Sequence, residues 1–385
     1  MLKIAILGTG AIADNHVQAF LKFKDQCEVV ALADLYPDKA AALAAKYNLR
    51  AAVFKTHQEL AAGAGFDAVS ICTPPFGHAE AAADLLRAGR HVLVEKPMAP
   101  SLEECDSMLA AAQAGGALLS VVAQNRFKTP MMKLKSLLAS GVIGKVLHAQ
   151  VDSYWWRGSN YYDLWWRGTW DKEGGGCTMN HAVHQIDLFQ WMMGMPAEVQ
   201  ALTMNLAHEN SEVEDFSSAV LRYDDGRVGQ ITASLVHHGE EQQLVFQGER
   251  AKIGAPWQVK AMKQRENGFP EPDAALMAEL QRLYDALPEV TCDGHDGQIA
   301  NFLAAIQGRE ALLVGGVQGR RTIELVTAIY QSSHVGRAVR LPLQPSDLFY
   351  TREGILKHAR RFHQKTRSVE NFADNQITLG RNFGK

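Results

Sequence analysis

The chain has 385 residues, 47% of them hydrophobic and 21% charged, and its 39 basic and 42 acidic residues give a formal net charge of −3. The length favours two or three domains, and the charge balance excludes a strongly basic nucleic-acid-binding surface. Five scattered cysteines without a C-x-x-C pair argue against disulfides or a cysteine zinc site. No apolar run reaches the roughly 20 residues that span a bilayer, and the chain starts with a strand in place of a signal peptide, so we expect a cytoplasmic protein without nucleic-acid or membrane partners.

A glycine-rich turn follows the first predicted strand, residues 2–7. It has the pattern G-x-G-x-x-A, formed by Gly8, Thr9, Gly10, Ala11, Ile12 and Ala13, and a helix is predicted from residue 11 to about 22. In such a turn the first glycine permits the tight bend, the second lets the backbone approach a pyrophosphate, and the small alanine lets helix and sheet pack closely. The helix N-terminus attracts the negative charge. The place of this motif between a strand and a helix predicts a dinucleotide site.

The second predicted strand, residues 28–33, ends in Asp34. A carboxylate at this position accepts hydrogen bonds from ribose hydroxyls and repels a 2′-phosphate. Leu35 and Tyr36 follow it in place of the arginine that NADP usually requires. The sequence therefore predicts NAD as the cofactor, and the alternative is that Asp34 only begins the turn before Pro37.

The alternation of strands and helices continues to residue 123. We expect helices over residues 37–47, from about 78, and over 102–113, and strands over residues 51–54, 68–72, 91–94 and 117–123. The strand 68–72 is followed by a turn of Thr73, Pro74 and Pro75, and His78 opens the next helix. This turn is expected to place rigid backbone beside the cofactor. A simple strand-to-helix turn is nearly as good an interpretation. Residues 1–123 are therefore predicted to form a doubly wound parallel sheet that binds NAD.

The tripeptide Glu95-Lys96-Pro97 closes the apolar strand 91–94. Ligands of an open parallel sheet bind beyond the carboxyl ends of its strands. Lys96 is therefore expected to project toward a substrate beside the nicotinamide. Gln124 and Arg126 follow the last strand of this domain, in a segment that is expected to cross the cleft.

Residues 124–345 are predicted to form a second α/β domain with a largely antiparallel, open sheet. A hairpin is expected from strands 217–223 and 228–235, because an Asp-Gly pair lies in the turn between them. The open face of such a sheet needs cover, which a partner subunit can supply. Residues 346–385 are a C-terminal extension with a basic amphipathic stretch at 355–363, which favours a docked helix or a strap between subunits over a helix that binds another protein.

A dense aromatic block begins the second domain, with five of the seven tryptophans between residues 155 and 170. Aromatic faces pack against the C–H faces of pyranose or cyclitol rings, so Trp165 and Trp166 indicate a sugar-like ligand. Arg157, Arg167 and Lys172 are candidates for pairing with a substrate carboxylate or phosphate. For any single tryptophan, a core or subunit contact is an equally good interpretation.

A glycine triplet at residues 174–176 precedes a predicted helix over residues 177–188. Asn180, His184 and Asp187 share one face of this helix, because residues three and four apart do so. An imidazole with a pKa of about 6.5 accepts a proton near neutral pH more readily than a lysine at about 10.4. His184 is therefore predicted as the base, with Lys96 polarising the substrate oxygen and Asp187 binding a neighbouring hydroxyl.

The same helix also contains the pattern H-x-x-H-x-x-D from His181 to Asp187, which admits a metal site. Three ligands with this spacing drift around the axis of a straight helix and do not converge on one ion without help from elsewhere. We therefore predict no metal.

Together these motifs resemble the glucose–fructose oxidoreductase and inositol dehydrogenase family over residues 2–342. The resemblance implies an N-terminal Rossmann domain, a C-terminal α/β domain whose open sheet serves dimer or tetramer contacts, catalysis by Lys96 and His184, and a cis bond before Pro97. Many members have aspartate at the position of Asn180. An asparagine still orients an imidazole but cannot offset its positive charge, which favours a proton relay dominated by the lysine.

We therefore expect an NAD-dependent dehydrogenase that oxidises a secondary hydroxyl of a sugar, sugar derivative or cyclitol, as a homodimer or homotetramer. The alternatives are an NAD-recycling glycosidase of the same fold and a non-catalytic dinucleotide-sensing regulator. The expected catalytic residues are Lys96, His184, Asp187 and Asn180. The expected cofactor-binding residues are Gly8, Thr9, Gly10, Ala11, Ile12, Asp34, Thr73, Pro74, Pro75, His78, Glu95, Lys96, Gln124 and Arg126. The expected substrate-binding residues are Lys96, Arg126, Trp165, Trp166, Arg167, Asn180 and His184.

Overall fold

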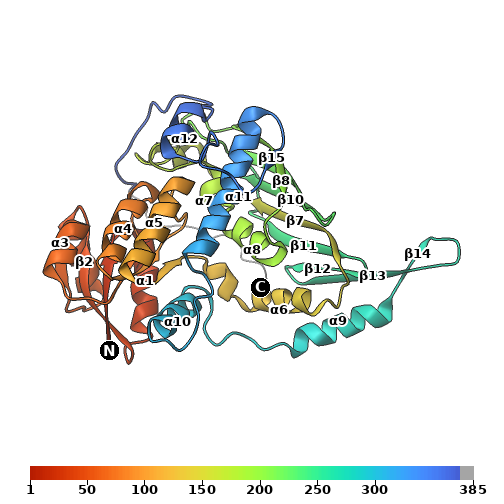
Figure 1. Ribbon diagram of the computed structural model, residues 1–385, viewed down its shortest axis with the longest axis horizontal. Coiled ribbons are helices and arrows are strands. Elements are labelled where there is room, and N and C mark those ends of the chain that lie inside the picture. Colours follow the sequence, from red (N-terminus) through yellow and green to blue (C-terminus); the bar gives the residue numbers. More distant parts are fainter. Residues whose placement is uncertain (373–385) are drawn as a thin grey trace.

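The computed structural model describes residues 1–372 and consists of two sheets with helices packed on them (Figure 1). The first sheet has six strands in the order β3-β2-β1-β4-β5-β6, and the second has nine in the order β14-β13-β12-β11-β7-β10-β9-β8-β15. All strand pairs of the first sheet are parallel. The second is antiparallel except where β7 pairs with β10. The predicted α/β fold class is confirmed.

The N-terminal domain alternates between strands and helices. Its elements are β1 (Leu2–Leu7), α1 (Ala11–Leu21), β2 (Cys27–Ala33), α2 (Pro37–Lys46), β3 (Ala52–Phe54), α3 (His57–Gly63), β4 (Ala68–Ile71), η1 (Pro75–Gly77), α4 (His78–Arg87), β5 (His91–Val94), α5 (Leu102–Gly115) and β6 (Leu119–Val121). The residues of β4 are all buried, as expected for a parallel strand with helices on both faces. The strand order reverses between β1 and β4, so a crevice forms at the carboxyl ends of the strands there.

The second sheet is built around the predicted hairpin. Its first part comprises η2 (Gln124–Phe127), α6 (Thr129–Ser140), β7 (Val146–Tyr154), η3 (Ser159–Asp163), α7 (Cys177–Asn180), α8 (Val183–Met193) and β8 (Glu198–Met204), and the remainder is β9 (Phe216–Arg222), β10 (Val228–Ser234), β11 (Gln242–Gly248), β12 (Ala251–Ala255), β13 (Gln258–Gln264), β14 (Pro270–Pro272) and α9 (Ala274–Ala286). The hairpin prediction is confirmed, because β9 and β10 pair antiparallel with Arg222 opposite Val228.

The last helices of the chain pack in part against the N-terminal domain. They are α10 (Gly294–Ile306) and α11 (Gly316–Val335), followed by the short β15 (Val339–Arg340) and α12 (Arg352–His358). Ile299, Phe302 and Leu303 of α10 are buried in one core with Phe20 of α1. The long helix α11 lies between the two halves and contacts both α5 and β8 (Figure 1). These two helices fix the position of the second sheet relative to the first.

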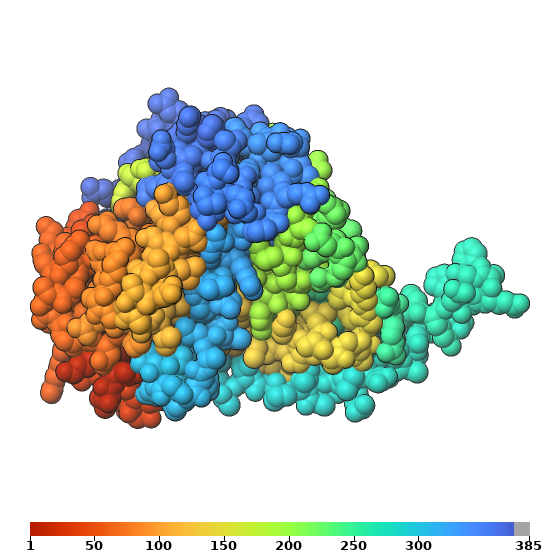
Figure 2. Space-filling model, in the orientation of Figure 1, coloured from red at the N-terminus to blue at the C-terminus, as the bar shows by residue number. Residues whose placement is uncertain are grey.

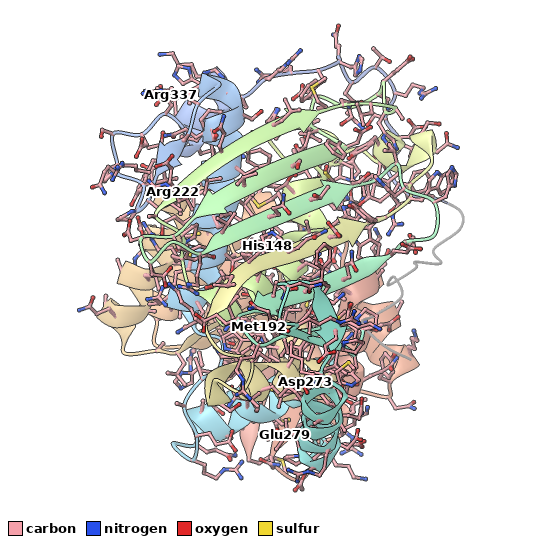
Figure 3. The ribbon with its side chains drawn as sticks, turned by 90° about the vertical axis from the view of Figure 1, so that its right-hand side faces the viewer. His148, Met192, Arg222, Asp273, Glu279 and Arg337 are labelled. Atoms are coloured by element: carbon pink, nitrogen blue, oxygen red, sulfur yellow. The ribbon has the colours of Figure 1, made fainter. Side chains whose placement is uncertain are left out.

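One face of the nine-stranded sheet is open (Figure 3). His148 of β7 and Arg222 of β9 lie on this face, and Leu202 and Val220 beside them are 54% and 50% exposed. The hairpin of β13 and β14 projects away from the body as an arm (Figure 2). Among residues 1–372, no helix is long and apolar enough to cross a membrane.

Candidate active site

Lys96 and His184 line one cavity, although they come from different domains. Lys96 follows β5 at the carboxyl edge of the parallel sheet, and His184 lies in the first turn of α8. Val122 and Ala123, which follow β6, line the same cavity. The Lys96–Pro97 bond is cis, as the resemblance implied. The predicted approach of a lysine and an imidazole across the cleft is thus present.

The ammonium group of Lys96 donates a hydrogen bond to the backbone carbonyl of Asn180 (3.0 Å). Burial lowers the pKa of Lys96, and the positive charge of Arg167 adds to this, while Glu95 and Glu173 act in the opposite direction. A lysine with a lowered pKa exchanges a proton more readily near neutral pH than a free lysine does.

His184 has an imidazole whose pKa lies well below 6.5, because burial and the nearby Lys96 disfavour its charged form. The ring is therefore neutral at neutral pH. A neutral imidazole has one nitrogen lone pair available to accept a proton. His184 thus has the protonation state that a general base requires.

The predicted continuous helix over residues 177–188 is wrong. α7 ends at Asn180 and α8 begins at Val183, and His181 and Ala182 form a turn between them. The side chain of Asn180 donates to the Gly175 carbonyl (2.8 Å). Asn180 therefore contacts Lys96 through its backbone carbonyl, and its amide holds the preceding turn together.

Asp187 and Arg126 form an ion pair with each other. Arg126 donates two hydrogen bonds to the carboxylate of Asp187, at 2.7 and 2.8 Å, and Thr322 adds a third at 2.9 Å. Arg126 is 1% exposed and Asp187 is 5% exposed. A buried bidentate pair of this kind is costly to open. Asp187 therefore fixes η2 against α8, and it lines the same cavity as Lys96 and His184, so its predicted role at a substrate hydroxyl stays a prediction.

The glycine-rich turn has the geometry that a pyrophosphate needs. Gly8 has φ +90°, and a Cβ there would lie 2.8 Å from the backbone of Cys72 and Thr73. A Cβ on Gly10 would meet only open space. Asp34 accepts hydrogen bonds from the Thr9 backbone N–H (2.7 Å) and hydroxyl (2.8 Å), so its carboxylate is held at the end of β2.

Two buried polar atoms near the cofactor crevice lack partners. Neither Thr73 Oγ1 nor Gln124 Oε1 has a hydrogen-bond partner within residues 1–372. Thr73 follows β4 and Gln124 follows β6. Buried polar groups are rarely left unpaired in proteins. A dinucleotide in the crevice would supply such partners, so these residues fit the predicted cofactor.

His78 and Glu95 form hydrogen bonds that link the turns around the site. The ring nitrogens of His78 lie 2.9 Å from the Pro97 carbonyl and 2.8 Å from the Thr73 carbonyl, which links the two turns. Glu95 accepts hydrogen bonds from the Lys96 backbone N–H (3.0 Å) and from the ring of His16 (2.8 Å). Both side chains were predicted to bind the cofactor. Their hydrogen bonds instead hold together the turns that form the crevice.

His16 is a residue that the sequence analysis missed. Its second ring nitrogen lies 2.8 Å from the Ser70 hydroxyl, so the imidazole is fixed at both ends. Burial alone lowers the pKa of His16, but Cys72 and Glu95 outweigh this and raise it to about 10. Burial raises the pKa of Glu95, yet His16 lowers it to about 2. The two side chains form a buried ion pair between α1 and the end of β5.

The aromatic loop, residues 159–172, reaches the cofactor side of the cleft. The ring of Trp165 meets the edge of Phe76, which lies in η1, with ring centroids 6.2 Å apart. The guanidinium of Arg167 lies 4.2 Å from the ring centroid of Trp166 and 4.1 Å from that of Tyr161. The loop thus brings the charge of Arg167 near Lys96 and the ring of Trp165 against the N-terminal domain, although none of its residues lines the cavity of Lys96 and His184.

The basic side chains of this region already have partners. Arg167 pairs with Glu173 (3.2 Å), and Arg157 pairs with Glu240. Lys172 lies 4.6 Å from the ring centroid of Trp165. Glu240 compensates the charge of Arg157, whereas burial raises the pKa of Glu173 to about 7, so Glu173 compensates Arg167 only in part near neutral pH. The expectation that a substrate anion pairs with these groups is thus weakened for Arg157 and stays open for Arg167. Of the other tryptophans, Trp155 and Trp170 are buried in the core, as the alternative interpretation allowed.

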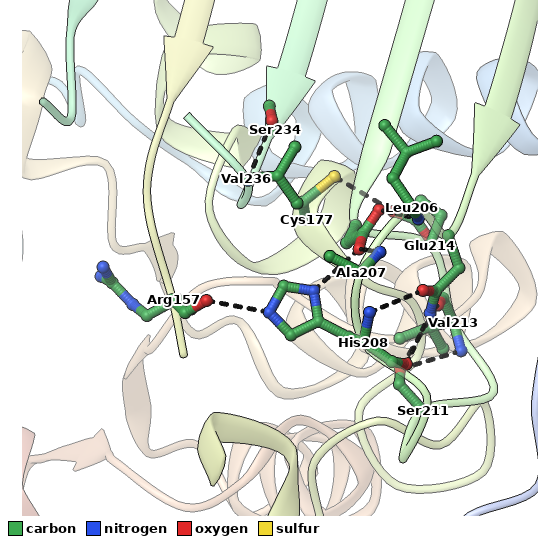
Figure 4. Close-up of polar contacts among 12 residues, drawn as sticks. Arg157, Cys177, Leu206, Ala207, His208, Ser211, Val213, Glu214, Ser234 and Val236 are labelled. Carbon is green, nitrogen blue, oxygen red and sulfur yellow. Dashed lines mark hydrogen bonds and ion pairs between the residues drawn. The ribbon is translucent and has the colours of Figure 1, made fainter. Parts of the chain in front are cut away.

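Glu214 is a second residue that the sequence analysis missed, because it lies far along the chain from the helix that it supports. Its carboxylate accepts hydrogen bonds from the backbone N–H groups of Gly176 (3.0 Å) and Thr178 (3.0 Å) and from the hydroxyl of Tyr330 (2.9 Å). Figure 4 shows it beside Cys177. The carboxylate thus caps α7, the helix whose last residue holds Lys96.

Comparison with known proteins gives two family matches. Residues 2–123 match the family described as "Oxidoreductase family, NAD-binding Rossmann fold", and residues 131–254 match the "GFO/IDH/MocA C-terminal domain". The chain is 25% identical to D-glucoside 3-dehydrogenase of Escherichia coli K12 over 359 residues, which is 88% of this chain and 97% of the relative. It is 31% identical to the NADP(+)-dependent scyllo-inositol 2-dehydrogenase IolU of Bacillus subtilis, over 75% of this chain and 89% of the relative.

The fold also resembles solved structures. The WlbA dehydrogenase from Bordetella pertussis, in complex with NADH and UDP-GlcNAcA, superimposes with a TM-score of 0.77 and 29% sequence identity. This match covers 89% of the present chain and 98% of the WlbA chain. The C-terminal extension beyond α11 lies outside both family matches.

Proposed function

Because the chain belongs to the GFO/IDH/MocA oxidoreductase family, we propose that it is an NAD-dependent dehydrogenase that oxidises a secondary hydroxyl of a sugar, sugar derivative or cyclitol. The observation that carries the proposal is the meeting of Lys96 and His184 in one cavity at the carboxyl edge of the parallel sheet. The activities named for its relatives on glucosides and inositols support the substrate class.

His184 and Lys96 divide the proton chemistry between them. NAD held at the turn of Gly8 and Gly10 would supply the hydride acceptor for the carbinol carbon. The neutral ring of His184 takes the hydroxyl proton, and the ammonium of Lys96 donates a hydrogen bond to the oxygen as negative charge develops on it. Asn180 keeps the ammonium aimed into the cavity through its carbonyl. The protein therefore positions a base and a cation on the same substrate oxygen.

The compensated charges favour an uncharged substrate. Arg157 is paired with Glu240 and Arg167 with Glu173, which leaves less positive charge for a substrate carboxylate or phosphate. Aromatic faces such as those of Trp165 and Trp166 suit the C–H face of a sugar or cyclitol ring. We therefore propose a neutral pyranose, glycoside or inositol over a sugar acid.

Asp34 supports NAD over NADP. Its carboxylate is held at the end of β2 by Thr9, where it would repel a 2′-phosphate. The IolU relative is named as using NADP(+), so cofactor choice is tested directly. We expect the Kd of NADH to be lower than the Kd of NADPH. Asp34→Ala should reduce the ratio of the NADPH Kd to the NADH Kd.

A substrate screen tests the proposed function against its alternatives. Purified protein is incubated with NAD and with pyranoses, glycosides, inositols and sugar acids, and NADH is followed at about 340 nm. A dehydrogenase accumulates NADH in proportion to the oxidised polyol. An NAD-recycling glycosidase releases aglycone without net NADH, and a sensor binds dinucleotide without turnover. Either of the last two results would contradict the proposal.

A further inference from the structure

The last part of the described chain, residues 359–372, forms a strap across the aromatic loop, and it lies outside both family matches. We propose that this strap is part of the substrate-binding machinery: it holds the aromatic loop over the cleft and thereby sets the affinity for the substrate. The expected effect on substrate affinity rests on the proposed dehydrogenase function. The expected ordering of the aromatic loop by the strap does not.

The strap supplies hydrogen bonds that the aromatic loop does not make internally. Val369 donates its backbone N–H to the Asp163 carbonyl (2.8 Å), and its own carbonyl accepts from the Trp165 N–H (2.9 Å). The ammonium of Lys365 donates to the Leu164 carbonyl (3.2 Å), and the indole N–H of Trp170 donates to the Arg360 carbonyl (3.1 Å). Both ends of the loop segment around Trp165 are thus fixed by the strap.

The strap is itself anchored to a rigid part of the second domain. Asn210, which is buried, accepts from the backbone N–H groups of Thr366 (2.8 Å) and Arg367 (3.0 Å) and donates to the side chain of Asp163 (2.8 Å). The segment that carries Asn210 is braced by the buried pair of His208 and Asp215, 2.7 Å apart. Figure 4 shows His208 and its link to the backbone of Arg157.

The extension also contacts the N-terminal domain on both sides of the loop. Arg352 of α12 donates to the Asp171 carbonyl (2.7 Å) and pairs with Glu104 of α5 (3.4 Å). Past the loop, Asn371 accepts from Lys39 of α2 (3.4 Å). The chain after α12 therefore runs from one part of the Rossmann domain, over the aromatic loop, to another (Figure 1).

This arrangement has a thermodynamic consequence for binding. Ordering a loop residue costs conformational entropy, and a loop that must be ordered on binding lowers affinity by that cost. The strap orders the aromatic loop beforehand. The glycine-rich turn at Gly8 and Gly10 is built from other elements, so loss of the strap should weaken substrate binding and leave cofactor binding unchanged.

The variant Val369→Pro tests the strap, because proline removes the N–H that Asp163 accepts. Val369→Ala is its matched control, because it keeps this N–H. For Val369→Pro we expect a substrate KM raised about tenfold, a kcat within about twofold of the natural protein, an unchanged Kd for NADH, and faster hydrogen exchange confined to residues 159–172. A chain that ends after His358 should show the same changes to a larger degree.

Unchanged KM and unchanged loop exchange in both Val369→Pro and the shortened chain would overturn the proposal. Faster loop exchange with an unchanged KM would also overturn it, because the strap would then be a structural support only. If the natural protein oxidises no polyol, the proposed function fails instead. The hydrogen-exchange comparison then still decides whether the strap holds the loop.

Discussion

The neutral state of His184 determines the pH range in which the site works. Burial and Lys96 hold the pKa of this imidazole well below 6.5, so the base keeps its lone pair at pH values where a free histidine is protonated. We expect kcat/KM to stay level as the pH falls past 6.5 and to decline only at clearly lower pH. His184→Asn should lower kcat by about 10²- to 10⁴-fold. A half-maximal rate already at pH 6.5 would contradict this assignment.

The buried pair of His16 and Glu95 should make stability depend on pH in two directions. The pKa of His16 is raised to about 10, so its contribution is complete below 6.5 and is lost as the pH rises toward 10. The pKa of Glu95 is lowered to about 2, so its contribution is complete above 4.5 and is lost as the pH falls toward 2. The pair therefore stabilises the fold most between pH 4.5 and 6.5.

His16→Leu should lower the free energy of unfolding by about 3–5 kcal/mol near pH 6, because it leaves a buried carboxylate without its partner. Urea titrations at pH 6 and pH 9.5 measure this difference, and we expect it to be smaller at the higher pH. A difference that is equal at the two pH values would show that the pair is not charged.

The sequence predicted individual site residues where a neighbouring strand or turn pattern identifies their position. Gly8 and Lys96 stand at the ends of apolar strands, so their positions at the carboxyl edge of the sheet follow from the order of elements. His16 and Glu214 have no such signal, because their partners lie far away along the chain. Asp187 lies on the predicted helix, but its pairing with Arg126 depends on how two domains meet.

The turn between β1 and α1 allows folding and cofactor binding to be separated. A Cβ on Gly10 meets only open space, whereas one on Gly8 would collide with the backbone after β4. Gly10→Ala should therefore keep the melting temperature and raise the Kd for NADH at least about tenfold, because its methyl group occupies the path of the pyrophosphate. Gly8→Ala should lower both stability and binding. Tight NADH binding by Gly10→Ala would show that the cofactor lies elsewhere.

The helix around His184 shows where patterns in sequence fail. Residues 177–188 have uninterrupted helical periodicity, yet the structure breaks between α7 and α8. The reason is tertiary, since Lys96 binds the Asn180 carbonyl, which in a continuous helix would accept from the N–H of His184. The β9–β10 hairpin was predictable because its Asp-Gly turn is local. The strap was foreseen only as a docked C-terminal segment, and its contacts with the aromatic loop depend on the fold of both domains.

At the scale of the whole molecule, the open face of the nine-stranded sheet is the candidate surface for a second copy. Leu202 and Val220 lie about half exposed on adjacent strands of this face, among polar side chains such as His148 and Arg222. We propose a homodimer or homotetramer that uses this face. Leu202→Glu should reduce the mass measured by light scattering, whereas Leu35→Glu, on the other domain, should not. A natural protein that is monomeric at micromolar concentration would contradict the proposal.

The N-terminal domain and the second domain form one active site only if Lys96 acts on a substrate beside bound NAD. The most direct test compares NADH formation and NADH binding in the natural protein and in Lys96→Met, with the best polyol found in the screen. The account predicts that the substitution lowers kcat by about 10²- to 10³-fold while the Kd for NADH changes by less than about threefold. Turnover by Lys96→Met at the rate of the natural protein would contradict it.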